Sequence, residues 1–168
     1  LHLSAFSSFE LNHKMSLYYP LDILVSEDNL VNQKLIEALL KKLGYQPVVV
    51  ETGEEVLSEV SNNQYDLIFM DYFMPDMNGA ELTQIILNHP NLAHKPKIIA
   101  MTASAMKEDY EKCLEAGMSG FISKPIRLSD IKSAIVNIVS VFQSAPHREL
   151  YDVNILDTSY LLKHFEKD

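Results

Sequence analysis

Cysteine, glycine and tryptophan are scarce in this sequence of 168 residues, which has one cysteine, five glycines and no tryptophan. The single cysteine, Cys113, excludes an internal disulfide framework and fits a reducing compartment. Neither of the glycine-rich phosphate-binding strings, G-x-x-x-x-G-K-[ST] and G-x-G-x-x-G, occurs. The cysteine and the histidines also lack zinc-ligand spacing. These absences argue against a disulfide-rich domain, a nucleotide enzyme built on those loops, and a zinc site.

Positive charge and long apolar runs are also limited. The 14 basic residues against 23 acidic ones give a formal net charge of −9. This balance argues against nucleic-acid binding by the chain as a whole, because phosphate contacts need clustered Lys and Arg. No apolar run approaches the roughly 18 residues that cross a bilayer. Residues 1–20 also lack the basic start and unbroken apolar stretch of a secretory signal. We therefore expect a cytoplasmic chain without direct nucleic-acid or membrane contact, although a longer parent protein could be membrane-anchored.

Hydrophobic residues make up 47% of the chain, and from Leu21 onwards they alternate between two kinds of pattern. Short apolar, β-branched runs predict strands at 21–26, 46–51, 66–71, 97–101 and 120–123. Helical spacing predicts helices at 30–43, from 52 onwards, and at 79–87, 105–116 and 128–142. This alternation predicts an α/β domain, with a parallel sheet covered by helices on both faces. We favour a five-stranded, doubly wound, flavodoxin-like sheet in the order 2-1-3-4-5, because right-handed crossovers leave few topologies.

The predicted helices have recognisable faces and ends. Apolar residues that recur every four positions predict the core face of the helix at 30–43, namely Val31, Leu35, Leu39 and Leu43. Gly44 and Gly117 are stop signals for the first and fourth helices. The stretch from Thr52 to Glu55 has the capping-box pattern, which predicts a helix start.

These elements divide the chain into three parts. We assign residues 21–143 to one domain and residues 1–20 to a linker or to added, non-native residues. Residues 144–168 combine a linker composition with a short amphipathic helix, either docked on the domain or beginning a following one. Because the chain begins at Leu1 rather than at a methionine, we favour a fragment of a longer protein.

Polar side chains follow four of the predicted strands. Glu27 and Asp28 follow the first strand, Asp71 ends the third, and Thr102 and Lys124 follow the fourth and fifth. Each alone has an ordinary explanation as a helix cap or a solvated side chain. The carboxyl ends of parallel strands meet at one edge of the sheet, however, where open α/β sheets bind their ligands. The five residues are therefore predicted to form one site.

Three clustered carboxylates repel one another, so they take up protons or bind a cation. Oxygen-only ligands suit magnesium. With a cation bound, Asp71 could attack phosphorus and form an acyl phosphate. Lys124 could pair with Asp71 and then with a phosphoryl oxygen, and the Thr102 hydroxyl could donate to another.

Four segments at these positions resemble the signatures of the two-component response-regulator receiver domain. The segments are EDN at 27–29, MDYFMPDMNG at 70–79, MTASA at 101–105 and SKP at 123–125. The resemblance covers roughly residues 21–143, and the motifs occur in the family's order and separation. It implies that Asp71 is the phosphoacceptor. Magnesium, or manganese, would be bound by Asp28, Asp71 and the backbone carbonyl of Phe73, with Glu27 completing the acidic pair.

The resemblance also implies a switch. Thr102 matches the switch hydroxyl, Lys124 the characteristic lysine, and the Lys124–Pro125 peptide is expected to be cis. Phe121 matches the switch aromatic, although an ordinary core position explains it equally well. The fourth helix, fifth strand and fifth helix would then form the signalling surface, which can also mediate dimerisation.

The expected partner is a histidine kinase or a phosphotransfer domain, in the same polypeptide if the parent is a hybrid sensor histidine kinase. Whether to count the domain as an enzyme stays open, because it would catalyse only its own phosphorylation and dephosphorylation. The alternative is a degenerate receiver that binds partners without phosphorylation, but none of the expected catalytic residues is missing. An aspartate-nucleophile phosphatase would need a second acid at the position of Phe73.

Overall fold

The computed structural model describes residues 14–103 and 106–144. Its five strands form one sheet in the order β2-β1-β3-β4-β5, with every neighbouring pair parallel. The strands are β1 (Ile23–Ser26), β2 (Val48–Val50), β3 (Leu67–Asp71), β4 (Lys97–Thr102) and β5 (Gly120–Ser123). The predicted fold class and strand order are confirmed.

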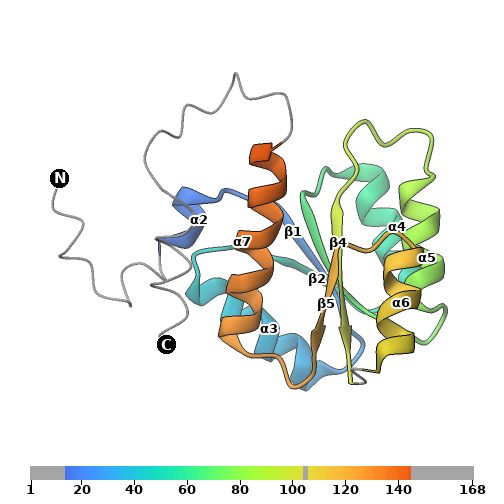
Figure 1. The fold of residues 1–168 in the computed structure, drawn as a ribbon, viewed down its shortest axis with the longest axis horizontal. Coiled ribbons are helices and arrows are strands. Elements are labelled where there is room, and N and C mark those ends of the chain that lie inside the picture. Colours follow the sequence, from blue (N-terminus) through green and yellow to red (C-terminus); the bar gives the residue numbers. More distant parts are fainter. Residues whose placement is uncertain (1–13, 104–105, 145–168) are drawn as a thin grey trace, which may run out of the picture.

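Helices cover both faces of this sheet (Figure 1). One face carries α2 (Met15–Tyr18), α3 (Leu30–Lys42) and α7 (Leu128–Ser144), and the other carries α4 (Gly53–Asn62), α5 (Gly79–Leu87) and α6 (Lys107–Glu115). Alternate residues of β3 supply the two cores. Leu67 and Phe69 belong to the cluster on the α3 and α7 side, whereas Ile68 and Met70 belong to the other. Because both faces are buried, the strand reads in the sequence as a continuous apolar run.

The core face of α3 differs from the predicted one. Val31 and Leu35 are 74% and 38% exposed. The residues that are fully buried are Ile36 and Leu40, followed by Leu43 at the helix end. At 3.6 residues per turn, a strict four-residue repeat drifts by about 40° per step around the helix. The row from Val31 therefore starts outside the core and reaches it only near Leu43.

The ends of the helices next to the sheet edge are set by local hydrogen bonds. The Asn29 side chain accepts from the Asn32 N–H at 3.1 Å, which starts α3 directly after Glu27 and Asp28. The predicted start of α4 is confirmed, because the Thr52 hydroxyl accepts from the Glu55 N–H at 3.2 Å. At the other end of α3, Gly44 has a φ of 93°, the left-handed conformation that glycine adopts without strain.

The packed body extends further towards the N-terminus than the expected limit at residue 21. Met15 of α2 is fully buried in the core cluster beneath α3 and α7. The Ser16 N–H donates to the Leu43 carbonyl at 3.1 Å, and the Tyr45 hydroxyl donates to the Tyr19 carbonyl at 2.7 Å. Residues 14–20 thus pack on the domain instead of forming a linker. The expected linker and short helix after 144 lie outside the described residues.

Within residues 14–103 and 106–144, no helix combines the length and the apolar composition needed to span a membrane.

Candidate phosphoacceptor and metal site

The predicted polar residues meet at the carboxyl edge of the sheet. Glu27 directly follows β1, Asp71 is the last residue of β3, and Thr102 is the last residue of β4. Lys124 follows β5, and its N–H donates to the Thr102 carbonyl at 2.7 Å. These strands are successive neighbours from β1 to β5, so their ends lie side by side. The predicted convergence is what the fold produces.

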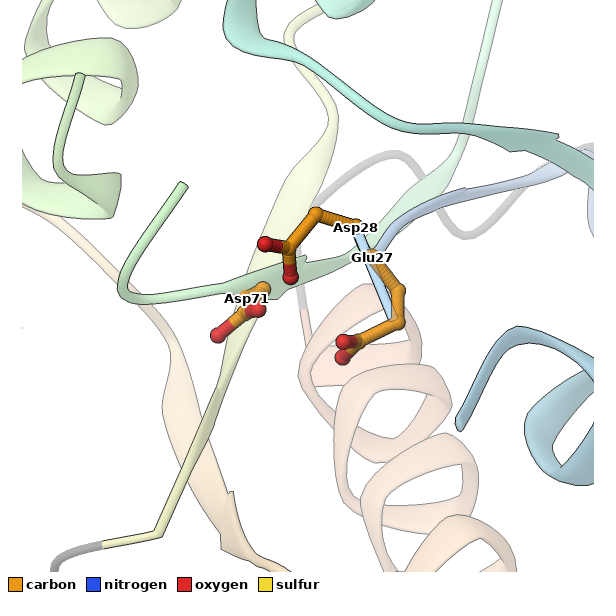
Figure 2. Close-up of side chains that lie close together, drawn as sticks. All are labelled: Glu27, Asp28 and Asp71. Atoms are coloured by element: carbon orange, nitrogen blue, oxygen red, sulfur yellow. The ribbon is translucent and has the colours of Figure 1, made fainter. Parts of the chain in front are cut away.

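Three carboxylates form the acidic part of the site. Oxygens of Glu27, Asp28 and Asp71 all lie within 4.8 Å of one another. Figure 2 shows that the three side chains come from the ends of neighbouring strands and gather in one place. Glu27 and Asp71 are buried, with 1% and 4% exposure, whereas Asp28 is exposed. The cluster therefore opens to solvent on the side of Asp28.

A single ammonium group bridges the two buried carboxylates. The Nζ atom of Lys124 lies 2.8 Å from Oε2 of Glu27 and 3.3 Å from Oδ2 of Asp71. Burial lowers the pKa of Lys124, but hydrogen bonds and charge interactions with Glu27 and Asp71 outweigh that effect, so its pKa is raised. Lys124 therefore stays cationic at neutral pH, and three carboxylates share one positive charge.

The pKa of Asp71 is raised from 3.8 to about 6. Burial is the largest cause, and the neighbouring Glu27 carboxylate is the second. Lys124 and a hydrogen bond from the Phe73 N–H, at 3.3 Å to Oδ1, act in the opposite direction without cancelling it. The ionised form of Asp71 is thus destabilised in the absence of a further cation.

Glu27 is oriented by α3 as well as by Lys124. Its Oε1 atom accepts from the Asn29 N–H at 3.1 Å and from Nδ2 of Asn32 at 3.4 Å. Its backbone carbonyl accepts from Nε2 of Gln33 at 2.6 Å. We did not predict the roles of Asn32 and Gln33, because polar residues in the first turn of a helix are ordinary surface residues in a sequence.

The two residues expected to form the switch lie on neighbouring strands. Thr102 is buried at the end of β4, with 4% exposure. Phe121 lies on β5, half-buried, and its ring meets that of Tyr110 in α6 edge-on, with the ring centroids 5.0 Å apart. Tyr110 has no signal in the sequence, because its proximity to Phe121 depends on how α6 packs beside β5. The Lys124–Pro125 peptide is cis, the geometry that the resemblance implies.

Comparisons with known proteins find one family model and many relatives that match most of this chain. The model of the response regulator receiver domain matches residues 23–136. Hybrid signal transduction histidine kinase B of Dictyostelium discoideum is 43% identical over 119 residues, which are 65% of this chain and 6% of that protein. The polar-differentiation response regulator DivK of Brucella anthropi is 37% identical over 107 residues, which are 64% of this chain and 86% of DivK.

A solved structure agrees with these relatives. The receiver domain of a sensor histidine kinase from Pseudomonas aeruginosa, with a magnesium ion coordinated in its active-site cleft, is 35% identical to this chain. The two structures superpose with a TM-score of 0.64, over 71% of this chain and 98% of that domain.

The chain spans between 4% and 11% of the length of five Dictyostelium hybrid kinases that it matches. The matched region, 23–136, contains every predicted site residue from Glu27 to Pro125. The strand order, the clustered acids and these similarities show that the chain belongs to the response regulator receiver domain family of two-component phosphorelay signalling.

Proposed function

We propose that the chain is a phosphorylatable receiver, in which Asp71 accepts a phosphoryl group from a phosphohistidine and the domain then changes conformation. The observation that carries this proposal is the position of the Lys124 ammonium, 3.3 Å from Asp71 at the edge of a three-carboxylate cluster. A buried carboxylate with a fixed ammonium beside it has the components of an activated nucleophile and a clamp for phosphoryl oxygens.

The residues present fit a divalent cation. The donors are carboxylate oxygens, which suit Mg²⁺ and also Mn²⁺, and their negative charge exceeds the single charge of Lys124. We propose Asp28, Asp71 and the Phe73 backbone carbonyl as the protein ligands. Both oxygens of Glu27 already have partners in α3 and Lys124, so Glu27 contributes mainly charge. When bound, magnesium would offset the negative charge that develops between the carboxylate and the phosphoryl group.

Asp71, Lys124 and Thr102 have separate roles in the phosphoryl transfer. An oxygen of Asp71 forms a bond to phosphorus, the phosphorus–nitrogen bond of the phosphohistidine breaks, and its electron pair stays on the imidazole nitrogen. Lys124 exchanges its contact with Asp71 for one with a phosphoryl oxygen. The Thr102 hydroxyl donates to a second phosphoryl oxygen, which draws the end of β4 towards Asp71. The site contains every residue that these steps require.

We propose that the conformational change is transmitted through α6, β5 and α7. Thr102 pairs with Ser123 of β5, and Phe121 on the same strand contacts Tyr110 of α6, so β5 links Thr102 to α6. A groove of about 430 Å³ runs along β5 and α7, lined by residues that include Phe121, Arg127, Asp130 and Asn137. This face is the proposed contact for a downstream partner or for a second copy of the chain.

The first test is Mg²⁺-dependent phosphorylation of the parent chain. We expect incubation with a small phosphodonor and Mg²⁺ to add the mass of one phosphoryl group, as measured by intact-mass spectrometry. Chelation of the metal should abolish the gain, because the carboxylate cluster then repels the donor. No gain with either the small donor or a phosphorylated kinase would favour the alternative, a receiver that binds partners without phosphorylation.

We propose that the phosphodonor is the histidine domain of a kinase or a phosphotransfer protein in the cytoplasm. Four exposed apolar side chains lie close in the sequence to the site residues, and we propose that they form an apolar rim on which a protein donor docks. They are Leu30, Val31, Phe73 and Met106, with exposures of 60%, 74%, 64% and 68%. Each lies within four residues of Asp28, Asp71 or Thr102 in the chain.

A charge in this apolar rim should impair only the protein donor. We expect Val31→Glu to slow phosphotransfer from a histidine-phosphorylated kinase domain about ten-fold, a loss typical of an interface anchor. The rate with a small phosphodonor should be unchanged. Leu17→Glu is the matched control, because Leu17 is also 74% exposed but lies in α2, at the other end of the sheet (Figure 1). Equal effects of the two substitutions would rule out this rim as the docking site.

A further inference from the structure

The loop between β3 and α5 has a closed shape. It carries Phe73, whose backbone pairs with that of Asn78 in an antiparallel bridge. Just outside this pair, the Gly79 N–H donates to the Tyr72 carbonyl at 2.7 Å. The two ends of the loop are therefore joined, and residues 74–77 form its tip. Phe73 directly precedes the tip in the chain, so the placement of the tip bears on the Phe73 backbone.

The tip is attached to a helix from a different crossover. Oδ1 of Asp76 accepts from the Gly53 N–H at 2.9 Å, and Oδ2 accepts from the Glu54 N–H at 3.0 Å. The bonds from Gly53 and Glu54 also lower the pKa of Asp76, so the carboxylate is charged at neutral pH. A carboxylate that accepts two backbone N–H groups at a helix N-terminus makes strong, charge-assisted hydrogen bonds.

Thr52 also caps α4, but its side-chain hydrogen bond stays within the start of the helix and does not involve the loop. Its hydroxyl accepts from the Glu55 N–H at 3.2 Å, so Asp76 and Thr52 satisfy three successive N–H groups of the first turn of α4. Loss of either side chain removes helix capping. Only the loss of Asp76 also removes hydrogen bonds between the loop and α4.

Two methionines fill the space around this attachment. A Cβ atom at Gly53 would lie 2.7 Å from Cγ of Met77, so glycine is needed for the loop to approach α4 this closely. Met74 is buried, and its Sδ atom accepts from the Ser26 hydroxyl at 2.7 Å. Ser26 directly precedes Glu27 at the end of β1. The tip is thus held against both α4 and the strand that carries the acidic pair.

We propose that Asp76 is a positioning residue for the metal site, and that its attachment to the N-terminus of α4 holds the loop so that the Phe73 backbone stays aligned with Asp71. This inference rests on the proposed function, because it assumes a cation at Asp28 and Asp71. The Phe73 N–H already donates to Oδ1 of Asp71 at 3.3 Å. Without the Asp76 hydrogen bonds, the loop would place Phe73 in this position for only part of the time. The free energy needed to order the loop would then oppose cation binding.

The test measures Mg²⁺ affinity by isothermal titration calorimetry on the parent chain, Asp76→Ala, Asp76→Asn and Thr52→Ala. We expect Asp76→Ala to weaken Mg²⁺ binding roughly 10-fold, as for loss of other outer contacts of a metal site. Asp76→Asn keeps one oxygen acceptor and should be intermediate. Thr52→Ala should lower the thermal midpoint without changing Mg²⁺ affinity, because it removes a cap of α4 and leaves the Asp76 bonds in place.

The outcomes separate positioning from helix stability. At saturating Mg²⁺, phosphorylation of Asp76→Ala by a small donor should return to within about two-fold of the parent rate, because the groups that react are intact. Equal Mg²⁺ affinity in the parent and Asp76→Ala would overturn the inference, as would an equal loss in Asp76→Ala and Thr52→Ala. A parent chain that binds no Mg²⁺ would overturn the inference together with the proposed metal site. A parent that binds Mg²⁺ but is not phosphorylated would overturn only the proposed function.

Discussion

Asp71→Asn is expected to abolish phosphorylation by every donor, because the amide replaces the carboxylate that ends β3, 3.3 Å from the Lys124 ammonium. An amide oxygen is a poor nucleophile towards phosphorus, so no acyl phosphate forms. Intact-mass spectrometry after incubation with a small donor and Mg²⁺ measures the effect. Asp22→Asn is the control, since Asp22 is an exposed residue just before β1, at the opposite edge of the sheet. A phosphoryl group retained in Asp71→Asn would place the acceptor elsewhere.

The same substitution should stabilise the metal-free domain at neutral pH. The pKa of Asp71 is about 6 in the folded chain, against an ordinary value of 3.8. Between these values the folded state binds more protons than the unfolded state, so the free energy of unfolding falls as the pH rises. Above about pH 6 the folded state carries the full free-energy cost of the ionised Asp71 carboxylate, and at about pH 4 this cost is absent. We expect Asp71→Asn to raise the free energy of unfolding by about 1–3 kcal/mol at pH 7.5 in the presence of a chelator.

Denaturant unfolding at several pH values tests this expected stabilisation. The difference in the free energy of unfolding between Asp71→Asn and the parent should shrink steadily from pH 7.5 to pH 4. Adding Mg²⁺ should stabilise the parent through binding to the folded state, and should stabilise Asp71→Asn much less. A variant that is less stable than the parent at pH 7.5 without metal would show that the three carboxylates do not strain the site.

Lys124→Met is expected to have the second largest effect, because it removes the cation shared by Glu27 and Asp71. Both carboxylates are almost fully buried, and breaking a buried ion pair by removing one partner costs about 3–5 kcal/mol. Lys124 also lowers the pKa of Asp71, so its loss should raise that pKa further above 6. At pH 7 less of the nucleophile is ionised, and phosphorylation should slow by about 10²-fold, the loss seen for single electrostatic donors.

Magnesium should partly compensate in this variant. A divalent cation supplies the positive charge that the methionine lacks, so we expect Lys124→Met to bind Mg²⁺ at least as tightly as the parent while it reacts more slowly. Chemical denaturation with and without Mg²⁺, together with the rate of mass gain, measures both effects. Lys42→Met, at the exposed end of α3, is the control for loss of one positive charge. If Mg²⁺ affinity fell in Lys124→Met, the lysine would act through the shape of the site and not through its charge.

The strands, the residues at their ends and several helix caps can be predicted from local sequence patterns. The strands β1, β3 and β4 are buried on both faces, so they appear as apolar runs whose ends are marked by Glu27, Asp71 and Thr102. In a parallel sheet all such ends lie at one edge, so placing the strands was sufficient to bring the acids, the threonine and Lys124 together. The starts of α3 and α4 and the stop at Gly44 are equally local, because capping involves residues three or four apart.

Contacts between distant segments could be determined only from the tertiary structure. The face of α3 was misassigned because several helical rows were apolar, and packing on the sheet selected the row with Ile36 and Leu40. The attachment of Asp76 to Gly53 joins residues 23 positions apart, and Lys124, directly after β5, reaches both Glu27 and Asp71. Residue types at strand ends follow from chain-local patterns, whereas distances, burial and the raised pKa of Asp71 depend on which segments the fold packs together.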